Sequence, residues 1–157
     1  MITTEELEEA LAARIEALPS DDWAQGMSPA ETWTESDIPL TAVQDSTLQQ
    51  HLAFSVSVEA APVVDDGNAS EGFLSVLPTV VVMFTYRLRS DRQRADLRTA
   101  QRAARQLVGA MMQPSNRWGS PLPLNIYTPG LPSEFLAVEQ RYTFQIDVPI
   151  PALGGIS

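Results

Sequence analysis

The residue types that could carry catalysis are few in this sequence. It has one histidine, His51, and no cysteine, which excludes a cysteine nucleophile and thiolate metal sites. No serine has the Gly-x-Ser-x-Gly setting of a nucleophile elbow. The eight glycines form no phosphate-binding motif, and the lysine of a P-loop is missing. We interpret His51, at the start of an expected strand, as structural, and we predict no catalytic residue, no cofactor and no enzyme.

One loop gathers oxygen ligands of the kind that calcium prefers. Asp65, Asp66, Asn68 and Glu71 lie close together in the sequence, but their spacing does not fit the alternate positions of an EF-hand. We therefore interpret residues 63–72 as a flexible hairpin tip and predict no metal site. A small hydrolase that uses clustered carboxylates stays open as an alternative, because carboxylate pairing is spatial.

A row of arginines is the most informative chemical feature. Arg94, Arg98, Arg102 and Arg105 recur at spacings of four, four and three, which places them on one face of an expected helix. This face could be solvated, or it could bind carboxylates of a neighbouring protein through the arginine fork. Nucleic-acid binding is the third interpretation, although such a surface usually mixes lysine with arginine in a basic protein.

The charges divide unevenly along the chain, whose net charge is −10. Residues 1–76 hold 15 acids and one arginine, whereas residues 77–157 hold 5 acids and nine arginines. Such asymmetry favours head-to-tail contact between copies, which closes into a ring when the rotation per copy permits. We hypothesise that the arginine row faces Glu5, Glu8 and Glu9 of the next copy.

The N-terminal third of the chain is expected to hold one helix and one long loop. Leu7, Leu11 and Ile15 recur at helical spacing within residues 3–18, and Thr3 with Glu6 fits a capping box. Residues 19–47 are irregular and form a predicted long surface loop. We interpret its Trp23 and Trp33 as loop anchors, or alternatively as contacts to a partner.

The rest of the chain alternates as strands around one helix. Residues 52–60 and 79–89 alternate as half-buried strands, 91–113 form a helix begun by Asp91, and 122–126 and 136–148 alternate again. The apolar run 73–84 is too short to span a membrane and predicts a buried strand. We expect a single α+β domain over 1–157, with about four mainly antiparallel strands and two helices on one face. The outer face of the sheet should stay polar.

Several of these stretches resemble the tail terminator, or minor tail, proteins of long-tailed phages and prophages. The resembling segments are Trp33-Thr34-Glu35-Ser36 with Pro39, His51–Val56, Val80–Arg89 and Ser90–Asp96. The similarity lies in pattern and element order from about residue 30 to 148.

The resemblance implies an α/β fold and a ring, commonly of six copies, that caps the tail tube. Its partners would be the chain itself, the tail tube protein and a neck or head-completion protein, with DNA only passing through the lumen. It would be assembled in the host cytoplasm into the virion tail, without a membrane or a cofactor. The alternatives are a head-closure or neck connector, a subunit of a tail-derived particle, and a nucleic-acid-binding module that uses the arginine helix.

Overall fold

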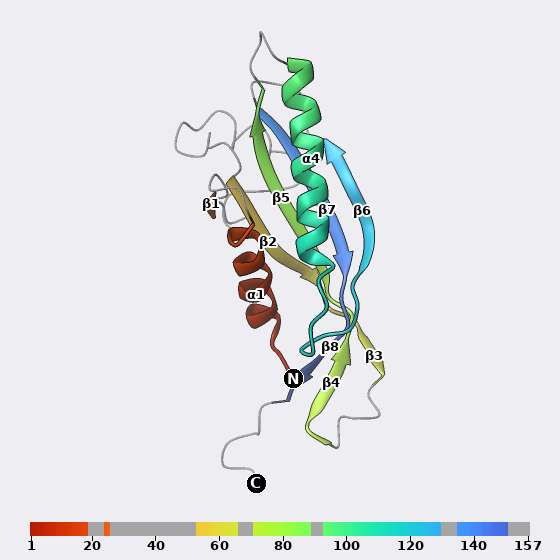
Figure 1. Ribbon diagram of the computed structural model, residues 1–157. Coiled ribbons are helices and arrows are strands. Elements are labelled where there is room, and N and C mark those ends of the chain that lie inside the picture. Colours follow the sequence, from red (N-terminus) through yellow and green to blue (C-terminus); the bar gives the residue numbers. More distant parts are fainter. Residues whose placement is uncertain (19–23, 26–52, 66–70, 89–92, 130–134, 151–157) are drawn as a thin grey trace.

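The fold is α+β, as the sequence predicts, with two helices and two sheets. A computed structural model describes residues 1–18, 24–25, 53–65, 71–88, 93–129 and 135–150 (Figure 1). The elements are α1 (Thr4–Glu16), β1 (Ala24–Gln25), β2 (Ala53–Ala60), β3 (Val63–Asp65), β4 (Phe73–Val76), β5 (Thr79–Arg87), α4 (Gln93–Met111), β6 (Leu122–Pro129), β7 (Phe135–Thr143) and β8 (Ile146–Pro149).

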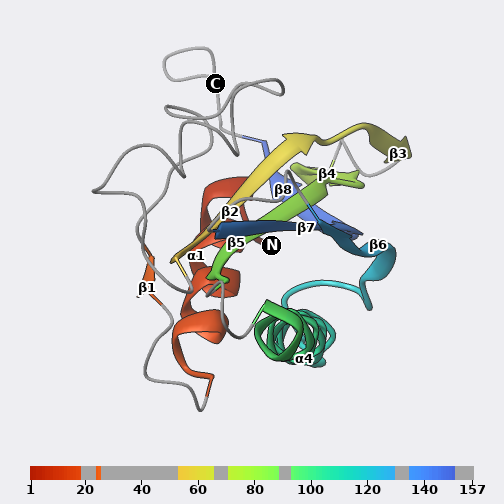
Figure 2. The same ribbon diagram turned by 90° about the horizontal axis from the view of Figure 1, so that it is seen from above.

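The main sheet has the strand order β1-β2-β5-β7-β6. Strands β2, β5, β7 and β6 are antiparallel to their neighbours, and only the short β1 runs parallel to β2. Both helices lie side by side on one face of this sheet (Figure 2). Strand β6 is therefore one edge of the sheet, and α4 lies near it.

Helix α1 begins as its sequence predicts. The Thr3 hydroxyl accepts a hydrogen bond from the Glu6 amide at 3.1 Å, and the Glu6 carboxylate accepts one from the Thr3 amide at 3.4 Å. These two bonds satisfy amides that the first helical turn leaves unpaired. Leu7, Leu11 and Ile15 are fully buried, so this helical face contributes to the core.

The second sheet, with order β3-β4-β8, corrects two sequence expectations. The apolar run 73–84 is two strands, β4 and β5, because Pro78 between them has no amide to donate to a continuous strand ladder. The expected long strand 136–148 is divided into β7 and β8, which lie in different sheets. The Phe144 amide donates to the Pro78 carbonyl at 3.0 Å, so both changes of sheet occur at the same place.

The expected hairpin tip 63–72 is partly strand. Val63–Asp65 form β3, which pairs with β4, while residues 66–70 lie outside the described residues. Gly72 has φ 93°, a left-handed conformation that glycine adopts without steric cost. Its carbonyl accepts a hydrogen bond from the Ile150 amide at 2.8 Å, which joins this turn to the end of β8.

The core lies between the sheet and the two helices. On α4, Ala103 and Ala110 are buried in this core, whereas Leu97 is 36 % exposed. Small alanines let α4 approach the sheet closely. Gln140 is also fully buried on the core face of β7, where its side-chain amide donates to the Ala104 carbonyl of α4 at 2.7 Å.

The outer face of the sheet is less polar than expected. Val81 and Met83 of the central strand β5 are buried there. Arg141 of β7 pairs with Glu59 of β2 and, at 2.6 Å, with Glu139. Because β2 and β7 flank β5, the Arg141–Glu59 pair reaches across the central strand, and these long side chains help to cover it.

Candidate functional site

The arginine row lies on the solvent side of α4. Arg94, Arg98, Arg102 and Arg105 are all exposed. At about 100° per residue, the row points away from the buried stripe that Ala100, Ala104 and Leu107 form. None of the four arginines makes an ion pair or hydrogen bond within the described residues. Within the described part of the chain, the row is therefore a set of unpaired positive charges presented to solvent.

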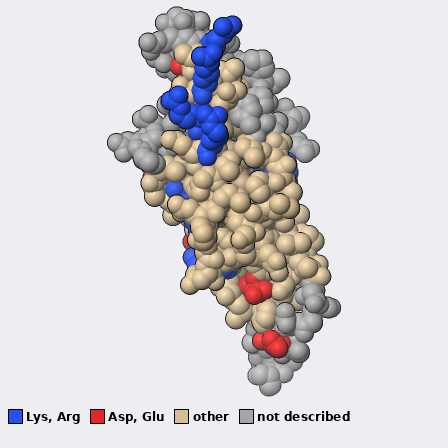
Figure 3. Space-filling view, turned by 45° about the vertical axis from the view of Figure 1, so that its right-hand side comes forward, with Lys and Arg blue, Asp and Glu red and all other residues tan. Residues whose placement is uncertain are grey.

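The arginines gather at one end of the face that α4 and β6 share. Figure 3 shows them above a broad area that carries little charge. Arg105 also lines a shallow pocket with Gln101 and Ala104 of α4 and Ile126 of β6. The arginine row and the edge strand are thus neighbouring parts of one surface.

Strand β6 exposes its alternating apolar side chains, which the sequence pattern predicted to lie on the buried face of a strand. Leu122 is 62 % exposed, Leu124 53 % and Ile126 46 %. The pairing of β6 with β7 is interrupted between Pro123 and Asn125 and again before Thr128. Such irregularities twist an edge strand and change the direction of its side chains. An apolar strip therefore adjoins the arginine row.

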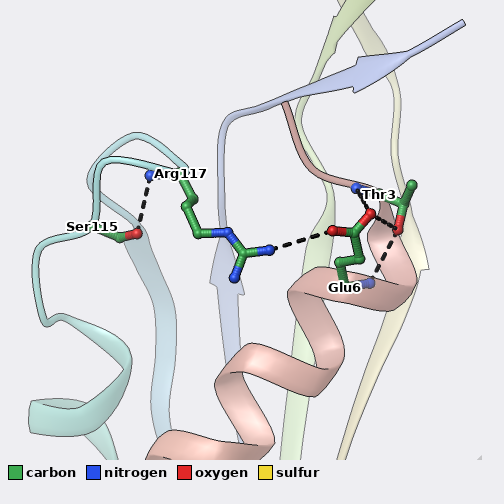
Figure 4. Close-up of polar contacts among 4 residues, drawn as sticks. All are labelled: Thr3, Glu6, Ser115 and Arg117. Carbon is green, nitrogen blue, oxygen red and sulfur yellow. Dashed lines mark hydrogen bonds and ion pairs between the residues drawn. The ribbon is translucent and has the colours of Figure 1, made fainter.

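The glutamates of α1 that were predicted to face the arginine row, Glu5, Glu8 and Glu9, lie in different environments. Glu5 and Glu9 are exposed and make no hydrogen bond or ion pair within the described residues. Glu6, in contrast, caps the helix through Thr3 and pairs with Arg117 at 3.4 Å (Figure 4). Arg117 belongs to the loop after α4, which is also held by its amide donating to the Ser115 hydroxyl at 3.1 Å.

Glu8 differs from the two other predicted interface carboxylates because it has a partner inside the protein. Its carboxylate accepts a hydrogen bond from the Val58 amide at 2.9 Å. Burial raises the pKa of Glu8, and the nearby Glu5 and Glu9 raise it further, while the bond from Val58 lowers it. Glu8 is therefore half-buried, and it provides the hydrogen-bond acceptor for one backbone amide of β2.

Arg14 shows which side of α1 faces the other helix. Its guanidinium donates to the carbonyls of Ala110 at 3.1 Å and Gln113 at 2.9 Å, and it lies 4.7 Å from the ring centre of Trp118. At about 100° per residue, Glu5 and Glu9 project from the side of α1 opposite Arg14. The free carboxylates thus face away from α4.

Glu16 is the residue that the sequence interpretation missed. It is exposed, and it lies seven residues after Glu9, which returns it to the same side of α1. It makes no hydrogen bond or ion pair within the described residues. A helical projection of residues 4–16 would have identified it, because the three free glutamates fall within one narrow sector.

The remaining predicted positions form no site in the described part of the chain. Trp23, Trp33, His51, Asp66 and Asn68 lie outside the described residues, and Glu71 is exposed. Among the residues that the structure covers, no three His, Asp or Glu side chains come together as a metal site would require. No described helix combines the length and hydropathy that crossing a membrane would need.

The chain was also compared with known proteins. Neither family models nor curated proteins give a match to it.

Proposed function

We propose that this protein is a structural subunit that associates head to tail into a ring and terminates a phage tail tube. The observation that carries the proposal is the division of charge across the helix layer. One outer side carries the arginines of α4 and the other the carboxylates of α1, and neither set has partners among the residues that the structure describes. Opposite charges on two different sides of one molecule favour a heterologous contact, which closes into a ring when the rotation per copy permits.

The tail assignment rests on the resemblance of residues 30–148 to tail terminator proteins. The α+β fold is compatible with it, and an acidic net charge of −10 suits a ring that lets DNA pass without binding it. In this role the protein binds other copies of itself, the end of the tail tube and a neck component. The ring would act through shape and charge, with no chemical step.

The mass of the protein in solution tests the ring. We expect light scattering to report a discrete multiple near six copies, with the ring weakened between low and moderate salt because screening reduces the attraction between exposed charges. When tail tubes are added, the protein should appear at tube ends in electron micrographs and stop their growth.

Two other outcomes would change the proposal. A ring that forms but does not bind tubes would favour a neck or head-closure connector. A protein that stays monomeric at every salt concentration, also in the presence of tubes, would contradict the ring.

A further inference from the structure

The two sets of unpaired charges lie on opposite outer sides of the helix layer. On α1, Arg14 points to α4, so the free glutamates point away from it. On α4, Arg105 adjoins Ile126 of the edge strand β6, on the side away from α1. Each copy therefore carries basic charge on one outer side of its helix layer and acidic charge on the other, with the packed helices α1 and α4 between them.

The charge rows also have the same length. The arginines extend from Arg94 to Arg105 and the free carboxylates from Glu5 through Glu9 to Glu16, so that the ends of each row are eleven residue steps apart. At a rise of 1.5 Å per residue, both rows are about 16 Å long. A row on one helix can therefore be matched along its whole length by the row on another.

The strip beside the arginine row favours a contact through side chains. Leu122, Leu124 and Ile126 are all exposed, which provides apolar area next to the charges. Strand addition at this edge is impeded, because Pro123 and Pro129 lack amide donors and the register is interrupted twice. A helix that packs beside β6 meets neither obstacle.

The arginine row disfavours a symmetric contact with itself. A two-fold interface through this surface would place four unpaired arginines against four others, and like charges at an interface oppose association. A head-to-tail contact instead brings arginine to glutamate, where the guanidinium fork can bind carboxylates bidentately. The charges therefore select a heterologous arrangement.

We infer that the surface formed by the arginine row and β6 receives helix α1 of a second copy, with Glu5, Glu9 and Glu16 facing the arginines. This inference rests on the proposed self-association and specifies its contact residues. Glu8 is excluded from the contact by its bond to Val58, and Glu16 takes its place.

Reciprocal charge reversal tests this pairing. One variant carries Arg98→Glu with Arg102→Glu, and the other carries Glu9→Arg with Glu16→Arg; all four positions are exposed. Arginine at position 16 also suits the C-terminal end of a helix, so α1 should still form. In each variant alone, the two reversed side chains bring like charges together at every contact, and its dissociation constant between copies should rise at least about tenfold.

An equimolar mixture of the two variants should associate again. In the mixture, the acidic α4 of one variant meets the basic α1 of the other, and the remaining contact pairs basic α4 with acidic α1. Sedimentation velocity of the wild type, each variant and the mixture measures this. Circular dichroism checks that both variants are folded.

The outcomes separate this inference from the proposed ring. If the wild type forms a ring and the mixture stays dissociated, or if the single variants still form rings, the α1–α4 pairing is wrong and the ring stands. A wild type and a mixture that are both monomeric would overturn both proposals. A mixture that associates while the wild type stays monomeric would support the contact and contradict the ring.

A matched pair of neutral variants controls for net charge. Glu5→Gln with Glu9→Gln removes two carboxylates from the inferred contact. Glu8→Gln with Glu71→Gln removes two carboxylates outside the inferred contact. The glutamine carbonyl at position 8 can still accept the hydrogen bond from the Val58 amide. Association should weaken in the first variant only; equal weakening in both would contradict the inferred contact.

Discussion

At the scale of single residues, a buried polar chain joins the sheet to α4. The Tyr142 hydroxyl donates to the Gln140 side-chain carbonyl at 2.7 Å, and the Gln140 amide donates to the Ala104 carbonyl at 2.7 Å. Gln140 and Tyr142 are fully buried, and burial raises the pKa of the Tyr142 hydroxyl. Buried polar groups of this kind stabilise one arrangement of sheet and helix, because leaving any member unpaired is costly.

Gln140→Leu should destabilise the protein, because it leaves the buried Tyr142 hydroxyl without an acceptor. We expect a loss of about 1–3 kcal/mol in the free energy of unfolding, measured by urea denaturation. Adding Tyr142→Phe removes the orphaned hydroxyl, so the double variant should lose less than the sum of the two single losses. Strictly additive losses would show that the two side chains are not coupled.

At the scale of elements, α1 and α4 are joined through one arginine. Arg14 binds the carbonyl of Ala110, which lies in the last turn of α4 and has no partner within the helix, and that of Gln113 just after the helix; its guanidinium also lies over the ring of Trp118. Trp118 in turn packs edge-on against Phe144, at 6.1 Å between ring centres, where β7 ends. This contact sets the position of α1 and hence the direction of its free glutamates.

Arg14→Lys should destabilise the protein although it keeps the charge. A lysine ammonium cannot reproduce the planar fork that bonds two carbonyls and stacks on an indole ring. We expect a loss of about 1–2 kcal/mol in the free energy of unfolding, measured by thermal or urea denaturation. Arg102→Lys, on the exposed row of α4, is the matched control and should leave stability unchanged. An equal loss of stability in Arg14→Lys and Arg102→Lys would contradict the proposed role of the Arg14 guanidinium in joining the two helices.

At the scale of the whole molecule, the distribution of charge distinguishes self-association from nucleic-acid binding. The protein has a net charge of −10, and in the view of Figure 3 most of the blue surface is gathered at one end. A DNA duplex laid along α4 would also approach the acidic remainder of the molecule. The attraction of four arginines is therefore opposed at longer range by the net charge.

We expect duplex DNA to bind too weakly to detect at physiological salt. Fluorescence anisotropy of a labelled duplex, measured at about 50 and 200 mM salt, is the test, because phosphate-dominated binding falls steeply over this range. Strong binding at low salt that is lost at high salt, and that Arg98→Glu with Arg102→Glu abolishes, would favour the nucleic-acid-binding module instead.

Local chemistry explains which parts of the fold the sequence could predict. The capping box of Thr3 and Glu6, the alternation in β2 and β5, and the helical spacing in α4 each depend on neighbours a few residues away, and the structure confirms them. The division of the last strand was not predictable in this way. Its apolar alternation continues through Phe144 into β8, although the pairing partner changes from β5 to β4.

For the candidate contact too, local features were predictable and features that depend on distant segments were not. The sequence by itself determined the arginine row and the acidity of α1, because helical spacing places such residues on one face. Only the tertiary structure decided which carboxylates are free, since Glu8 is held by an amide fifty residues away and Glu6 by a loop beyond α4. It also decided that β6 is an edge and exposes its apolar side chains. Strand order depends on pairings between distant segments, and these leave no periodicity in the sequence.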